Sequence, residues 1–190
     1  MPGYNVVDEV SQSLVGVLQD GLTVLGATVA ADDLLGTPAG TLHLTVFLFE
    51  VGEDPNSRNR PRSRELQTPD IRISRAPVAL HLRYLLTPWG GTESSRQVLL
   101  GRAIQLLNDR AIMSGPQLVG SLAAEDQTIN VMMSPLSLED RTRVWHAVQK
   151  PYRLSVAYDV RVVHLDSEVS RQVRPVRERG IATVTPGGAA

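Results

Sequence analysis

The feature that most constrains the fold is a long alternating segment that follows a helix-breaking proline, Pro151. Apolar residues occupy every second position, and the positions between them are mostly small, polar or charged: Leu154, Val156, Tyr158, Val160 and Val162 alternate with Ser155, Ala157, Asp159 and Arg161. A period of two predicts a full-length β-strand with one face packed and the other meeting water or a partner. The chain must therefore build a sheet, with a helix docked on it.

Helical spacing of apolar residues predicts one helix over about Val6–Gln19 and another over about Glu93–Ile112. Residues 22–35 are ambiguous between strand and turn. Further strands are predicted over three segments, Thr41–Val51, Val78–Leu86 and Thr128–Met133. Because strands and helices mix without regular βαβ alternation, we expect the α+β class. The sheet should be mostly antiparallel, with helices packed on one face.

A third, short helix is predicted just before the alternating segment. Ser137 provides a capping signal, and the helix should end at about Val148. Trp145 lies on this helix beside Leu138 and Val148. A large aromatic side chain at such a place is expected to anchor the helix to the sheet rather than to line a binding site.

The chain of 190 residues is long enough for one well-packed domain. We expect a single α+β domain over residues 1–166. Residues 53–70 have almost nothing to bury and are expected to form an exposed, arginine-rich loop. Residues 167–190 turn polar and end in Gly-Gly-Ala-Ala, so a flexible C-terminal tail is predicted.

The composition argues against several classes of function. A net charge of −1 and an aromatic content of 4% disfavour binding to nucleic acid or to a membrane surface. No run of about 18 apolar residues is present, so no transmembrane helix is expected. The absence of cysteine excludes disulfides, thiolate zinc sites, iron–sulfur clusters and cysteine nucleophiles.

No catalytic, cofactor-binding or metal-ligating residue is predicted, and we expect no enzyme activity. The histidines show none of the usual metal-ligand spacings: His43, His81, His146 and His164. Phosphate-binding glycine loops and the GxSxG nucleophile motif are also missing from the sequence. The acidic pairs Asp32–Asp33 and Glu125–Asp126 fall in predicted turns, where solvated carboxylates are common.

The strongest charge cluster is the arginine loop, whose candidate docking residues are Arg58, Arg60, Arg62 and Arg64. It can serve as a docking arm for an acidic partner, or it can be a solvated insertion without a partner. Nucleic acid is disfavoured because aromatic residues are absent and Glu53, Asp54 and Glu65 flank the run. For a protein partner, both interpretations stay open.

An ordered series of segments resembles the terminator, or cap, proteins of contractile injection systems, the phage-tail-like particles that include antifeeding prophages and Photorhabdus virulence cassettes. The matching segments are Val6–Leu14, Ala79–Pro88, Leu99–Leu107, Pro116–Leu118 and Trp145–Tyr158. Together with the residues between them, they extend over nearly the whole expected domain, from about Val6 to Asp166.

The resemblance implies a structural role in a tail-terminator-like fold. Members of that family form a hexameric ring that ends the inner tube and holds the last sheath ring. The implied partners are further copies of the chain, the sheath protein and the inner tube protein, with no cofactor, nucleic acid or membrane. The implied location is the cytoplasm, within an assembled particle that is in some cases released. The residues also leave two alternative functions open: a small-ligand or regulatory binding domain, and an enzyme with a dispersed active site.

Overall fold

The computed structural model describes residues 3–36, 40–57, 63–67, 70–125 and 127–174. The chain forms two compact units. Unit 1 contains residues 1–60 and 77–166, and unit 2 contains residues 61–76 and 167–190. The second unit is therefore built from an insertion in the first and from the C-terminal part of the chain. The α+β fold with a mostly antiparallel sheet is confirmed.

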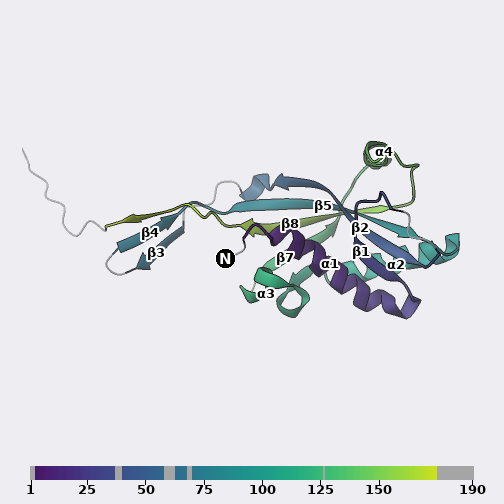
Figure 1. Cartoon of the computed structure of the whole chain (residues 1–190), viewed down its shortest axis with the longest axis horizontal. Coiled ribbons are helices and arrows are strands. Elements are labelled where there is room, and N and C mark those ends of the chain that lie inside the picture. Colours follow the sequence, from purple (N-terminus) through teal and green to yellow (C-terminus); the bar gives the residue numbers. More distant parts are fainter. Residues whose placement is uncertain (1–2, 37–39, 58–62, 68–69, 126, 175–190) are drawn as a thin grey trace, which may run out of the picture. The chain divides into compact units, whose positions relative to one another are not determined.

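The described residues of unit 1 form a sheet in the order β1-β2-β5-β8-β7-β6 (Figure 1). Its strands are β1 (Thr28–Ala31), β2 (His43–Glu53), β5 (Val78–Trp89), β6 (Ile112–Ser114), β7 (Thr128–Met133) and β8 (Val156–Leu165). The pair β1–β2 is parallel, and the other pairs are antiparallel. The alternating segment of the sequence thus becomes the central strand β8, paired on one side with β5 and on the other with β7.

Three helices cover one face of this sheet: α1 (Val6–Leu22), α2 (Glu93–Asp109) and the short α3 (Gly120–Ala124) (Figure 1). The apolar stripe of α1 is fully buried, as helical spacing predicts: Val6, Val10, Leu14, Val17 and Leu18. The stripe packs with Leu82, Tyr84 and Leu86 of β5 and with Tyr158 and Val160 of β8. This large cluster is the main core of unit 1.

Helix α4 (Leu138–Ala147) lies on the opposite face of the sheet (Figure 1). A second core there joins Leu85 of β5, Ala157 of β8 and Trp145 of α4. Leu85 and Ala157 alternate with the residues of the main core, so they point to the other side of the sheet. The prediction of helices on one face is therefore wrong for α4, because both faces of the sheet carry apolar residues at this end.

Trp145 anchors α4, as predicted. Its side chain is 1% exposed, and its ring centroid lies 6.3 Å from that of Trp89 in a tilted arrangement. The indole N–H donates a hydrogen bond to the hydroxyl of Ser155 over 3.3 Å. Leu138 is 60% exposed and takes no part in this anchor.

Unit 2 contains a second antiparallel sheet in the order β3-β4-β9. Its strands are β3 (Ser63–Gln67), β4 (Asp70–Ser74) and β9 (Ser170–Val173). Strand β3 lies inside the predicted loop 53–70, and β9 lies inside the predicted tail 167–190, so both predictions differ from the structure. These strands form although many of their residues are polar, because the backbone amide and carbonyl groups pair between strands whatever the side chains are. Residues 58–62, 68–69 and 175–190 of those segments lie outside the described residues.

Short 3-10 helices complete the described chain: η1 (Thr23–Leu25), η2 (Pro55–Ser57) and η3 (Gly115–Gln117). Within the described residues, no helix has both the length and the apolar character that crossing a membrane requires.

Candidate docking surfaces

The predicted docking arginines fall largely outside the part of the chain that the structure describes. Arg58, Arg60 and Arg62 are outside it. Arg64 lies in β3, where its backbone is opposite Ile73 of β4. The structure therefore places one member of the cluster in a strand of unit 2 and leaves the gathering of the four side chains an open prediction.

A network of charged side chains lies on the face of the large sheet that also carries α4. Arg83 of β5 lies opposite Asp159 of β8 on one side and Glu50 of β2 on the other. Its guanidinium donates to the Asp159 carboxylate over 3.2 Å, to the Glu50 carboxylate over 2.8 Å and to the Ser134 hydroxyl over 3.3 Å. The guanidinium of Arg83 also lies over the ring of Phe49, with its central carbon 5.5 Å from the ring centroid.

Burial and charge act in opposite directions on Arg83. Partial desolvation by itself lowers the pKa of the guanidinium, but the hydrogen bond and charge of Glu50 together with Asp159 raise the pKa above its usual value. Asp159 is 5% exposed, and His81 places its Nε2 atom 3.5 Å from the same carboxylate. The arrangement holds a buried carboxylate between two basic side chains on this face of the sheet.

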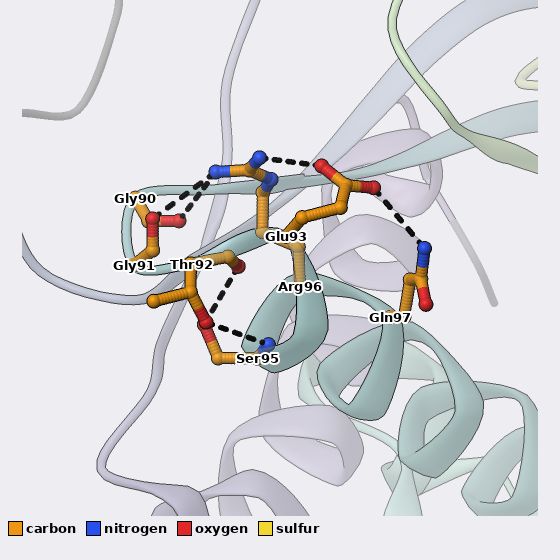
Figure 2. A network of polar contacts seen from close by, with 7 residues as sticks. All are labelled: Gly90, Gly91, Thr92, Glu93, Ser95, Arg96 and Gln97. Carbon is orange, nitrogen blue, oxygen red and sulfur yellow. Dashed lines mark hydrogen bonds and ion pairs between the residues drawn. The ribbon is translucent and has the colours of Figure 1, made fainter.

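A tight corner joins β5 to α2 (Figure 2). Thr92 caps α2 by accepting a hydrogen bond from the Ser95 amide over 3.2 Å. Arg96 reaches back to the carbonyl oxygens of Gly90 and Gly91, each over 3.1 Å, and pairs with the carboxylate of Glu93. The hydrogen bonds from Arg96 and then Gln97 hold the pKa of Glu93 below its usual value. These contacts fix the start of α2 relative to the end of β5.

A groove of about 320 Å³ opens beside this corner. It is lined by Pro88, Glu93 and Arg96 and by the segment that precedes β8, residues 151–154. Tyr152 and Leu154 are 41% and 44% exposed, and the guanidinium of Arg153 stacks on Trp89 at 4.6 Å from the ring centroid. Tyrosine and arginine side chains are enriched at protein interfaces, so this groove is a candidate contact surface.

Among the described histidines, His43 of β2 contacts the neighbouring strand β1. His43 Nδ1 lies 2.7 Å from the Thr28 hydroxyl, and burial lowers the pKa of His43 although the charge of Asp32 opposes that shift. Among the described residues, no group of three or more histidine, aspartate or glutamate side chains is placed to hold a metal ion.

Sequence reasoning missed both the Arg83 network and the groove. Glu50, Arg83 and Asp159 are far apart in the chain, and strand register alone brings them together. A usable signal was present in the alternation, because charged residues at Arg83 and Asp159 interrupt otherwise apolar strands. In contrast, no sequence pattern indicates that Pro88 and residues 151–154 line one groove.

A match to a known protein family identifies the family of this chain. The sequence profile of the family described as the Pvc16 N-terminal domain matches residues 9–179. The chain belongs to the Pvc16 N-terminal domain family. The resemblance to terminator proteins inferred from the residues is thereby confirmed. No curated protein sequence matches the chain.

Two solved structures share the fold of this family member. The sheath/tube terminator of an extracellular contractile injection system, PVC, in its extended state gives a TM-score of 0.72 at 16% identity, covering 100% of this chain and 67% of that chain. The tube terminating cap of the anti-feeding prophage gives a TM-score of 0.66 at 18% identity, covering 96% of this chain and 62% of that chain. The chain thus spans roughly two thirds of the length of these proteins.

Proposed function

We propose that this member of the Pvc16 N-terminal domain family is a structural cap of a contractile injection system. In this proposal a ring of six copies ends the inner tube and holds the last sheath ring, without catalysis. The supporting observation is the family match over residues 9–179, combined with a fold shared with a sheath/tube terminator and a tube terminating cap. The cap would assemble in the cytoplasm as part of the particle.

The surfaces of unit 1 are compatible with this role. The Arg83 network and the corner at α2 connect adjacent elements through hydrogen bonds. A rigid scaffold with an exposed groove suits a protein that must match the end of a regular polymer, because a preorganised surface loses little entropy on binding.

The test is to purify particles from cells with and without this gene and to measure their lengths by electron microscopy. We expect a ring of this protein at one end of normal particles and over-long, open or disassembling tubes in the deletion. Normal capped particles that lack the protein would overturn the proposal.

The arginine loop is the proposed docking arm of the cap. We predict that replacing Arg58, Arg60, Arg62 and Arg64 by serine weakens attachment to the particle. The variant loses the positive charges that would attract the loop to an acidic surface. The thermal unfolding of the chain should be unchanged. Co-purification with the particle measures attachment, and wild-type tail length with full co-purification would contradict this prediction.

A further inference from the structure

Unit 2 lacks a core of its own in the part that the structure describes. Every described side chain of residues 71–76 and 167–174 is exposed or half-buried, whereas unit 1 has two buried clusters. A sheet of three strands, each of four or five residues, is stable only when a hydrophobic face is covered. The described part of this unit supplies neither a helix nor a second sheet layer as a cover.

One face of the strands β4 and β9 carries apolar and basic side chains together. Ile71 and Ile73 alternate along β4, and Val173 of β9 lies opposite Ile71, so these three side chains share a face. A groove of about 230 Å³ is lined by Ile73, Val173 and Val169, with Arg75 and Arg171 beside them. Val169 is 59% exposed. This apolar patch with its arginines is called the basic face below.

The two units carry opposite net charges. Unit 2 contains eight arginines and four acidic residues, which gives a net charge of +4. Unit 1 contains eleven basic and sixteen acidic residues, which gives a net charge of −5. The charge of −1 for the whole chain therefore conceals a strong separation between the units. Unit 1 of a second copy carries a net negative charge that would complement the basic face of unit 2.

We propose that the basic face of unit 2 docks on the acidic unit 1 of a second copy. Such a contact joins two different surfaces, so each copy both donates and accepts it. A repeated contact of this head-to-tail kind closes into a ring when its rotation closes. The inference rests on the proposed function and deepens it, since it names the contact between neighbouring copies in the cap.

The first test reverses two charges of the basic face with the double substitution Arg75→Glu and Arg171→Glu, at two exposed positions. The control is Arg72→Glu with Arg174→Glu, which changes the same number of charges on unit 2 at positions that alternate with those of the basic face. Sedimentation velocity over a concentration series should show association of the wild type and the control, weakened by high salt because the contact is steered by charge. The dissociation constant of the Arg75→Glu and Arg171→Glu variant should be at least about tenfold higher than that of the wild type.

A graded variant separates lost charge from lost folding. Arg75→Gln with Arg171→Gln should give an intermediate loss of association, whereas local unfolding of unit 2 would give the same loss for both pairs. A wild type that stays monomeric at every concentration and salt, or a reversed variant that associates like the wild type, would overturn the proposal. A wild type whose basic face docks within its own chain would also stay monomeric, so this case too overturns the proposal.

The second test maps the partner surface. Because the chain has no cysteine, Val169→Cys offers one attachment point for a photoreactive cross-linker in the groove. In a mixture of ¹⁴N- and ¹⁵N-labelled full chains, we expect cross-links between copies that land on unit 1. Cross-links confined to one copy, or to unit 2 of the other copy, would overturn the proposal.

Particles distinguish this inference from the proposed function. If the gene deletion leaves tubes uncapped while the Arg75→Glu and Arg171→Glu variant caps them normally, the cap function stands and the contact proposed here is wrong. If the deletion leaves normal capped tubes, the cap function itself fails.

Discussion

At the residue scale, the corner between β5 and α2 depends on a glycine. Gly90 has a φ of +68°, and a Cβ atom there would collide with the backbone carbonyl of Thr41. Both the left-handed conformation and the lack of space oppose any side chain. The same residue supplies a carbonyl oxygen that accepts from Arg96, so a shift of its backbone would also loosen the start of α2.

We therefore predict that Gly90→Ala lowers the free energy of unfolding by about 2 kcal/mol or more. Gly101→Ala is the matched control, because Gly101 lies within α2 with open space around it. Alanine favours a helix interior, so this control should raise stability by about 0.5–1 kcal/mol. Urea unfolding of the two variants should give opposite signs, and equal effects would contradict the role assigned to Gly90.

A second residue couples stability to alkaline pH. Tyr84 is fully buried and shares a hydrogen bond of 2.9 Å with Ser11, and burial raises the pKa of Tyr84 to about 12. The unfolded chain loses the phenolic proton near pH 10. The folded state therefore holds the proton more tightly, and its stabilising contribution is complete below about pH 10 and lost as the pH rises towards 12.

We predict that Tyr84→Phe costs about 1 kcal/mol at neutral pH through the lost hydrogen bond. Between about pH 10 and 12 the variant should lose less stability than the wild type, although Tyr158, whose pKa burial also raises, still contributes. Urea unfolding at pH 8 and pH 11 checks this difference. An identical loss in both proteins would contradict it.

At the element scale, α4 is held to the sheet mainly through one side chain. Trp145 fills the second core against Trp89, and a helix of ten residues has little stability without such packing. We predict that Trp145→Ala removes about 3–5 kcal/mol from the attachment of α4. Hydrogen exchange should then show lost protection in α4 with α1 unchanged.

Leu138→Ala is the control for this prediction, since Leu138 is 60% exposed on the same helix. It should change stability by no more than about 0.5 kcal/mol. Loss of protection spread evenly over α1 and α4 in the Trp145 variant would show that α4 is an integral part of the main core instead.

The predictability of an element follows from how much it buries. Helices α1 and α2 and strand β7 can be predicted because their buried apolar residues recur with the spacing of a helix or a strand. Strands β1 and β9 have four residues each, and β9 is mostly polar, so backbone pairing rather than pattern creates them. The face on which α4 packs cannot be predicted either, since an apolar stripe shows that a helix is buried but not against which side of a sheet.

The candidate surfaces are predictable only in part. A charge cluster such as Arg58–Arg64 is contiguous in the sequence and can be found by inspection. The Arg83 network and the groove at Pro88 depend on strand register and on the packing of separate segments. The opposite charges of the units can be counted only when the division of the chain is known.

At the scale of the whole molecule, both buried clusters belong to unit 1. We predict that unit 1 folds when residues 61–76 are replaced by a Gly/Ser linker of about eight residues and the chain ends at Asp166. The thermal transition should stay cooperative, with a midpoint within about 5 °C of the wild type. Circular dichroism checks this, and a broad, non-cooperative transition would show that unit 1 needs unit 2.

The position of β8 has a consequence for how the protein is made. It is the last strand of unit 1 to leave the ribosome, yet it lies between β5 and β7. Until about residue 165 is synthesised, the earlier strands form two separate ladders, β1-β2-β5 and β6-β7, each with an unpaired inner edge. Nascent chains therefore carry open edges until β8 is synthesised, and these edges need protection from pairing with one another.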